Sequence, residues 1–278
     1  MTFYESLHRY RIELLLTLVL VSLLYGRSVA GMVGDWYRDD NYAHGFLVPL
    51  IAGYFIYERW DDLKASRVVP SLAGLAIILV ALLQLTIGTV GLEYFTIRSS
   101  LVVLVAGIVL FIWGSGVFRT LRLPIGYLLF MVPLPYIIHD QIAFPLKQFV
   151  SRVSVAVMHL LGVTVVRDGN IIMFPGITLE VADACSGIRS LVSILALSIA
   201  YAFFLQISPL KRWIVILSSI VIAIAANALR VIITGILASY HGARVAEGFF
   251  HEFAGLAVFA LAMAMLVALG LLLRGKAS

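Results

Sequence analysis

The stretch that decides the fold covers residues 213–239 and reads WIVILSSIVIAIAANALRVIITGILAS, with Arg230 as its one charged residue. A helix needs roughly 20 apolar residues to cross the hydrocarbon core of a bilayer. This stretch is long enough, so it predicts a transmembrane helix. An arginine inside a span is costly unless it faces the bundle interior, water or an anion. We therefore interpret Arg230 as a functional residue.

The composition places the whole chain in the same class. Of its 278 residues, 62% are hydrophobic and only 13% are charged. Such a chain has too little polar surface for an ordinary soluble domain, so we expect an all-α polytopic membrane protein. The net charge of +5 requires no nucleic-acid partner, because basic residues anchor cytoplasmic loops at anionic membrane lipid. One integral membrane domain is expected over residues 1–278.

About eight transmembrane helices are predicted. They cover residues 13–33, 44–60, 70–91, 97–114, 121–136, 186–206, 213–239 and 249–273. The second and fifth are short and contain proline, which is typical of tilted, broken or partly re-entrant segments. The first resembles a signal peptide, but Arg27 beside its candidate cleavage site indicates a retained anchor.

The positively charged residues predict the orientation. Eight spans place the two ends and every second loop on one side, and these segments hold 11 of the 20 basic residues: Arg9, Arg11, Arg59, Lys64, Arg67, Arg119, Arg122, Lys211, Arg212, Arg274 and Lys276. Cytoplasmic loops carry an excess of lysine and arginine. Both termini are therefore expected in the cytoplasm, and the long segment 136–184 is expected on the outer face.

This outer segment predicts a small subdomain. Residues 140–162 carry apolar side chains at helical spacing together with Lys147 and Arg152, which favours an amphipathic helix in the membrane interface. Three β-branched runs follow, separated by Asp168-Gly169 and Pro175-Gly176. Asp-Gly between two such runs is a strong hairpin signal. We expect a β-hairpin or three-stranded meander that leads the chain to Cys185.

Cys185 is the only cysteine. One cysteine excludes an intramolecular disulfide, a cysteine-rich zinc site and a thioredoxin-like pair. It stands just before an apolar helix, where unpaired amides and the helix dipole stabilise an anion and lower the pKa of a thiol. Arg189, four residues later, falls on the same helix face. The alternative is that Cys185 is a small buried hydrophobic residue.

Three other polar residues belong to the outer half of the predicted bundle. His251 opens the last span and could exchange a proton with a nearby thiol. Asn227, one turn before Arg230, could hold its guanidinium or a polar substrate atom. His44, at the outer mouth of the second span, could line a substrate entrance or serve as an interfacial anchor.

Structural interpretations of Arg230 and His251 stay open. Arg230 could form an ion pair with Glu252, Asp183 or Glu180, since charges inside membranes are usually paired. His251 could be an interfacial histidine held by water or by Glu252. No metalloprotease, nucleotide-binding or paired metal-ligand motif occurs in the sequence, so neither a metal site nor a cofactor is expected.

In order along the chain, these motifs resemble the exosortase/archaeosortase family of membrane transpeptidases. The resemblance rests on Trp36 and Asp39, Tyr42-Ala43-His44-Gly45-Phe46-Leu47-Val48-Pro49, Ala184-Cys185-Ser186-Gly187-Ile188-Arg189, Asn227-Ala228-Leu229-Arg230-Val231 and His251. It implies an eight-span cysteine peptidase whose catalytic residues correspond to Cys185, Arg230 and His251. The resemblance implies arginine rather than histidine at this last position in archaeal members, so His251 points to the bacterial branch of the family.

The resemblance also implies the substrate and location. The family recognises a C-terminal sorting tail made of a short motif such as Pro-Glu-Pro, a hydrophobic helix and a basic end. It cleaves at the motif and transfers the protein to an acceptor, which could be an amine, a glycan or a lipid-linked group. In Gram-negative bacteria it is associated with exopolysaccharide production, which implies the cell inner membrane. Candidate substrate-binding residues are Asn227, Arg189, His44 and Ser186.

The implied chemistry is acyl transfer through a thioester on Cys185. Arg230 would stabilise the oxyanion, and His251 would act as base and then as acid. The principal alternative is a transporter or flippase-like protein in which Arg230 binds an anionic lipid-linked sugar and Cys185 is incidental. A second alternative is a non-catalytic membrane partner of polysaccharide assembly. Thiol labelling by a peptide electrophile separates these alternatives, because only the peptidase needs Arg230 and His251 for it.

Overall fold

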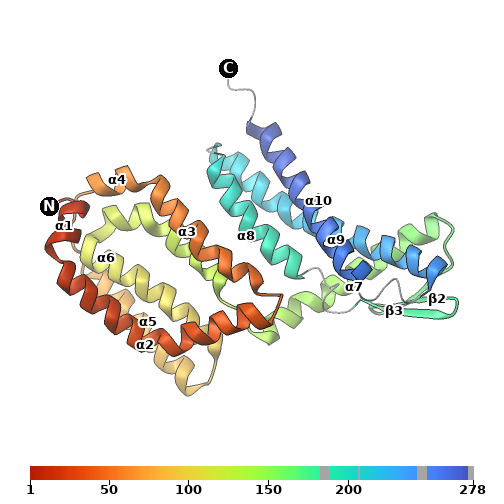
Figure 1. The fold of residues 1–278 in the computed structure, drawn as a ribbon, viewed down its shortest axis with the longest axis horizontal. Coiled ribbons are helices and arrows are strands. Elements are labelled where there is room, and N and C mark those ends of the chain that lie inside the picture. Colours follow the sequence, from red (N-terminus) through yellow and green to blue (C-terminus); the bar gives the residue numbers. More distant parts are fainter. Residues whose placement is uncertain (182–187, 206, 243–248, 275–278) are drawn as a thin grey trace. The chain divides into compact units, whose positions relative to one another are not determined.

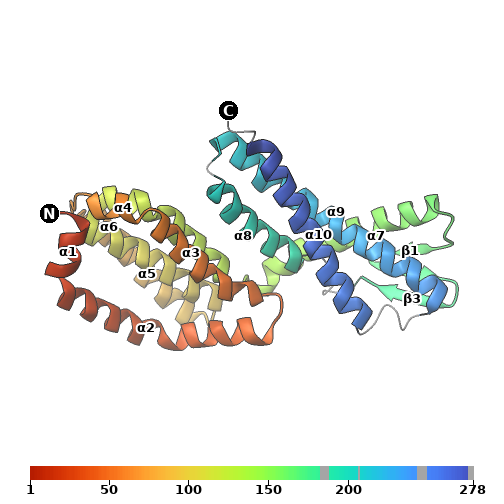
Figure 2. The same ribbon diagram turned by 45° about the horizontal axis from the view of Figure 1, so that its top comes forward.

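The computed structural model describes residues 1–181, 188–205, 207–242 and 249–274, and the side chains of 249–252 are outside the description. The chain forms two compact units, Met1–Pro135 and Tyr136–Ser278 (Figures 1 and 2). Unit 1 contains α1 (Phe3–Arg9), α2 (Arg11–Arg38), η1 (Ala43–Phe46), α3 (Leu47–Glu58), α4 (Trp60–Ala65), α5 (Ala73–Val90), α6 (Tyr94–Tyr127) and η2 (Leu128–Met131). Unit 2 contains α7 (Tyr136–Leu160), β1 (Val166–Asp168), β2 (Ile171–Phe174), β3 (Ile177–Glu180), α8 (Ile188–Phe204), α9 (Pro209–His241) and α10 (Phe249–Arg274).

The described helices confirm a polytopic helical membrane protein. Five of them are long and apolar enough to cross a membrane: Arg11–Arg38, Ala73–Val90, Tyr94–Met131, Pro209–His241 and Phe253–Arg274. The apolar helix Ile188–Phe204 is shorter. These helices confirm the class, but eight spans are not confirmed.

The predicted spans 97–114 and 121–136 do not form two helices joined by a loop. Helix α6 consists of two helical segments, before and after Gly114, between Tyr94 and Tyr127; the chain then continues as η2 and is irregular over residues 132–135. The helix is interrupted at Gly114, whose φ of 82° and ψ of −173° are non-helical. A Cβ at Gly114 would lie 1.7 Å from the carbonyl oxygen of Val69. Glycine is needed here because a side chain would collide with that extended segment and strain the backbone.

Helices α5 and α6 pack closely through glycines. A Cβ at Gly74 would lie 2.2 Å from the Phe111 nitrogen, and one at Gly107 would lie 2.9 Å from Ile78 Cγ1. Small residues let helix backbones approach in membranes, where dispersion contacts and hydrogen bonds hold helices together. The buried Tyr25 of α2 joins this pair, with its hydroxyl 2.8 Å from Ser100 Oγ on α6.

Three of the basic segments gather at one end of unit 1. The Phe3 amide donates to the Ser66 carbonyl at 2.9 Å, and the Val68 amide donates to the Met1 carbonyl at 3.1 Å. Arg59 Nη1 donates to the Thr120 carbonyl at 3.3 Å. The predicted topology requires these segments to share a side of the membrane, and the contacts agree with that requirement. The side itself stays a prediction.

Residues 136–180 form the helix and the strands predicted for the segment before Cys185. Helix α7 buries one stripe of its surface, including Val150, Ser154 and Met158, which confirms an amphipathic helix. The strands form an antiparallel sheet in the order β1-β2-β3, so the three-stranded meander is also confirmed. Its turns place Gly169 at φ 60° and Gly176 at φ 81°. Glycine adopts this left-handed conformation at no steric cost.

Helix α9 joins the two parts of unit 2. Its first part packs with α8 and α10 around buried residues such as Ala223 and Leu266. Its last part packs on α7 and the sheet, where a Cβ at Gly235 would lie 3.0 Å from Phe174 Cζ and 3.1 Å from Met158 Sδ. At 1.5 Å per residue α9 is about 50 Å long, which exceeds the ~30 Å of a hydrocarbon core. One helix therefore accounts for both a span and the support of the sheet.

Candidate functional site

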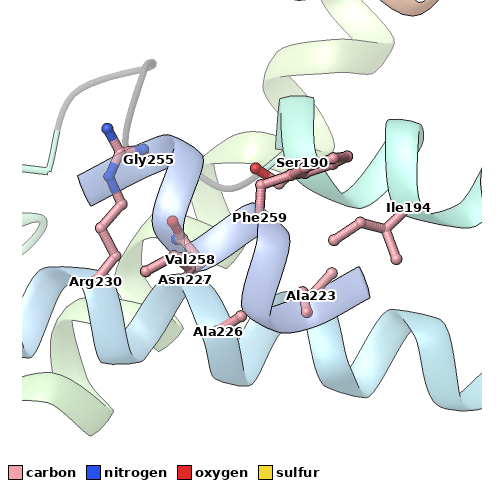
Figure 3. Close-up of a pocket in the computed structure, with 10 residues that line it drawn as sticks. Ser190, Ile194, Ala223, Ala226, Asn227, Arg230, Gly255, Val258 and Phe259 are labelled. Atoms are coloured by element: carbon pink, nitrogen blue, oxygen red, sulfur yellow. The ribbon is translucent and has the colours of Figure 1, made fainter. Parts of the chain in front are cut away.

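A small pocket lies among the three bundle helices of unit 2 (Figure 3). Its lining residues come from all three helices: Ser190 and Ile194 from α8, Ala223, Ala226, Asn227 and Arg230 from α9, and Gly255, Val258, Phe259 and Ala262 from α10. About 10 Å³ is open to the centre of a water molecule, which is roughly the room that one water needs. The pocket combines apolar walls with the polar groups of Ser190, Asn227 and Arg230.

Helix geometry brings two polar side chains of α9 to this pocket. Asn227 and Arg230 are three residues apart, so they lie on the same side of the helix. Asn227 is buried, with 4% of its surface exposed, and Arg230 is half-buried with its Nε atom inside the protein. A half-buried guanidinium and a buried amide in an apolar helix bundle supply directed hydrogen-bond donors in a region of low dielectric constant.

The guanidinium of Arg230 lies against α10 at Gly255. A Cβ on Gly255 would be 3.1 Å from Nη2, 3.2 Å from Cζ and 3.5 Å from Nη1 of Arg230. His251 is four residues earlier in α10, so the two positions share a helix face. The side chain of His251 lies outside the described residues. The backbone nevertheless places its position one turn from the glycine that the guanidinium contacts.

The pocket lies far from the basic end of the bundle. At that end Lys211 Nζ donates to the Leu273 carbonyl at 2.7 Å, which ties the start of α9 to the end of α10. Helical rise puts Arg230 about 28 Å from Lys211 along α9, and Gly255 about 27 Å from Leu273 along α10. Both distances approach the ~30 Å thickness of the hydrocarbon core. The site therefore lies about one membrane thickness from Lys211 and the end of α10.

Three predicted site residues stand at or just before the start of α8 in the sequence. Arg189 is the second residue of α8 and is half-buried, while its neighbour Ser190 lines the pocket. A cation in the first turn is unfavourable with respect to the helix dipole, so its placement there is not explained by helix stability. Cys185 and Ser186 lie outside the described residues, between Val181 and Ile188.

His44 belongs to unit 1, where it contacts the backbone. Its Nε2 lies 3.2 Å from the Phe130 carbonyl oxygen and acts as the donor. Two neighbouring side chains make similar bonds, from Trp36 Nε1 to the Met131 carbonyl at 2.9 Å and from the Tyr42 hydroxyl to the Leu134 carbonyl at 3.3 Å. Residues 130–134 have irregular or 3₁₀ backbone, whose carbonyls need partners in an apolar environment. The three side chains thus supply hydrogen-bond donors to three backbone carbonyls of this segment.

Sequence reasoning missed two features of the structure. Gly255 is one, because a glycine in an apolar helix carries no chemical signal by itself. The other is Arg98, with 7% of its surface exposed, which forms an ion pair with Asp35 at 2.6 Å and lies 5.4 Å from the centre of the Tyr94 ring. Arg98 falls inside the predicted span 97–114, so the rule that selects Arg230 could have found it too.

Within the described part of the chain, no three His, Cys, Asp or Glu residues are grouped so that they could hold a metal ion. The apolar helices and the buried polar pocket define a helical membrane protein with a polar site inside its bundle. Residues 36–268 match the transmembrane exosortase family, and the chain belongs to that family. No curated protein and no solved structure shows a significant match.

Proposed function

We propose that this protein is a membrane-embedded cysteine transpeptidase that cleaves a C-terminal sorting tail and transfers the processed protein to an acceptor. Family membership supports a membrane sorting transpeptidase. The observation that carries the proposal is the contact of the Arg230 guanidinium with Gly255, one helical turn from His251, in a pocket that Ser190 of α8 also lines. These three helices supply the cation, the base and the helix that follows the nucleophile.

Cys185 is the proposed nucleophile. It precedes Ile188, the first residue of α8, by three residues in the sequence. The thiolate attacks the carbonyl carbon of the scissile peptide, and the carbonyl electron pair moves to oxygen. A thiolate is favoured near the positive end of a helix dipole.

Arg230 stabilises the resulting oxyanion in this mechanism. Its guanidinium offers several N–H donors in a fixed plane, held between α9 and α10. Removal of one oxyanion donor typically lowers kcat by about 10²- to 10³-fold. Asn227 supports the same oxyanion or the tail's polar atoms from the adjacent turn of α9.

His251 transfers the proton in both halves of the reaction. It first takes the thiol proton of Cys185, and then gives it to the departing amine when the tetrahedral intermediate collapses. The carbon–nitrogen bond breaks, the tail leaves with its new amino terminus, and the protein remains as a thioester on Cys185. An acceptor amine, or water, then attacks the thioester after losing a proton to His251, which regenerates the thiol.

The depth of the site suits a tail that spans the membrane. The sorting tail would insert its hydrophobic helix in the bilayer, with its basic end in the cytoplasm and its short motif at the outer surface. The pocket is about one hydrocarbon thickness from Lys211. We propose the cell inner membrane, cytoplasmic termini and an active site on the outer face. Arg189, Ser186 and His44 are proposed contacts to the tail.

The test is processing of a reporter protein that ends in Pro-Glu-Pro, a hydrophobic helix and a basic cluster. Cys185→Ser should abolish cleavage without unfolding the protein, because a hydroxyl is similar in size to a thiol and far less ionised near neutral pH. Thermal unfolding of the detergent-purified variant supplies the folding control. A Cys185→Ser variant that cleaves the reporter at the wild-type rate would refute the proposal and favour the transporter alternative.

A further inference from the structure

Helix α10 has two glycines that face large side chains of other helices, and the two contacts differ in severity. A Cβ at Gly270 would lie 2.3 Å from Cε1 of Tyr201 on α8, which is a steric overlap. A Cβ at Gly255 would lie 3.1 to 3.5 Å from the guanidinium atoms of Arg230 on α9. The end of a long side chain can shift by a few tenths of an ångström, so Ala at Gly255 fits if Arg230 moves.

Helix propensity does not explain Gly255. Glycine is about 1 kcal/mol less favourable than alanine in a helix interior. Apart from Gly270, the other small residues of this apolar helix are alanines, as at Ala254, Ala257 and Ala260. The three atoms nearest to a Cβ at Gly255 all belong to the Arg230 guanidinium. The missing Cβ therefore matters for where that guanidinium lies.

We infer that Gly255 is a positioning residue, which lets the Arg230 guanidinium lie directly on the α10 backbone and so sets its place relative to the turn that carries His251. This inference rests on the proposed function, in which the guanidinium stabilises an oxyanion. The guanidinium reaches the face shared by Gly255 and His251 because position 255 has no side chain to hold it away from the α10 backbone. A Cβ there would displace the donors from the position at which negative charge develops.

The test compares Gly255→Ala with Gly270→Ala in the full-length protein, using the reporter with the Pro-Glu-Pro tail. Gly255→Ala should lower kcat by about 3- to 10-fold with little change in KM, since a misplacement of 1 Å can cost on the order of 100-fold. Its thermal midpoint should equal or exceed that of the wild type, because alanine favours the helix. Gly270→Ala should lower the thermal midpoint, because Tyr201 blocks the added methyl group.

A double-mutant cycle with Arg230→Lys identifies the guanidinium as the group that Gly255 positions. Lysine has no planar fork to collide with the added methyl group. Gly255→Ala should therefore change kcat by less than about twofold in the Arg230→Lys background, because the contact between position 255 and the guanidinium is already absent there. A purely structural role for Gly255 would produce the same loss in both backgrounds.

Three outcomes overturn the inference. They are an unchanged kcat in Gly255→Ala, a lowered thermal midpoint of that variant comparable to Gly270→Ala, and an equal loss of kcat in the Arg230→Lys background. Failure of the proposed function looks different: Arg230→Ala would then process the reporter at the wild-type rate. The inference alone fails when Arg230→Ala is impaired and Gly255→Ala is not.

Discussion

Replacement of Arg230 separates its charge from its packing. The residue is half-buried at the pocket of unit 2, its Nε atom is inside the protein, and its guanidinium lies 3.1 Å or more from the Cβ position of Gly255. Arg230→Met keeps most of the apolar stem and removes the donors. Arg230→Ala removes both, and Arg230→Lys keeps the charge without the planar fork.

The expected effects of these substitutions on kcat and on the thermal midpoint follow from the position of the guanidinium. If it stabilises the oxyanion, Arg230→Met and Arg230→Ala should both lose about 10²- to 10³-fold in kcat, equivalent to about 2.7–4 kcal/mol of transition-state stabilisation. Arg230→Lys should retain part of that rate. Only Arg230→Ala should also lower the thermal midpoint noticeably, because it alone removes the packed stem between α9 and α10.

The assay is single-turnover cleavage of the tail-bearing reporter at saturating concentration, so that the rate of the chemical step is separated from binding. Alkylation of Cys185 by iodoacetamide reports on folding and access at the same time, since this is the only thiol in the chain. An Arg230→Met variant that cleaves the reporter at a rate within threefold of the wild type, together with a large loss of that rate in Arg230→Ala, would assign Arg230 to packing and refute its role in the reaction.

Three further predictions concern topology and stability. With Cys185→Ala as background, a cysteine at Asp168 should react with a membrane-impermeant maleimide from outside the cell, and labelling only from the cytoplasm would reverse the predicted orientation. His44→Ala should destabilise the purified protein by about 1–3 kcal/mol because it leaves the Phe130 carbonyl unsatisfied, whereas His44→Gln, which keeps an N–H donor, should lose less; equal losses would contradict the hydrogen-bond account. Burial alone would raise the pKa of Glu93, but hydrogen bonds from Thr96 and Phe95 and the charge of Arg98 outweigh it and lower that pKa below its ordinary value of 4.5. The stability that Glu93 contributes is thus present above pH 4.5 and lost as the pH falls through its folded-state pKa; Glu93→Gln should flatten this part of the thermal-midpoint profile, and an unchanged profile would contradict the assignment.

The sequence alone indicates the class, the helix and three-stranded sheet of residues 136–180, and the family. Apolar length and charge distribution depend on the solvent that each segment meets, so the membrane class needs no tertiary information. The turn glycines Gly169 and Gly176 are local signals as well, and both adopt the positive φ that such turns require. The ordered motifs from Trp36 to His251 resemble exosortases, and the family match over residues 36–268 confirms that resemblance.

Helix boundaries depend on more than local sequence. Hydropathy divides residues 97–136 into two spans, and in the structure two helical segments meet at a kink at Gly114 without a loop between them. Gly114 is needed because Val69, distant in the sequence, approaches its backbone closely. The predicted span 97–114 ends at the residue where the kink lies. The contact between Gly114 and Val69, which explains why the break lies there, cannot be read from the composition of either segment.

The amino-acid sequence by itself determined that this protein is a helical membrane protein of the exosortase family, because spanning length, basic loops, turn residues and motif order are properties of local segments. Only the tertiary structure decided that the Arg230 guanidinium rests on Gly255 and that Asp35 pairs with Arg98. In each case the partners lie on different helices, and their distance depends on how closely two helices pack and how each is rotated about its axis. Those quantities follow from the packing of many side chains at once.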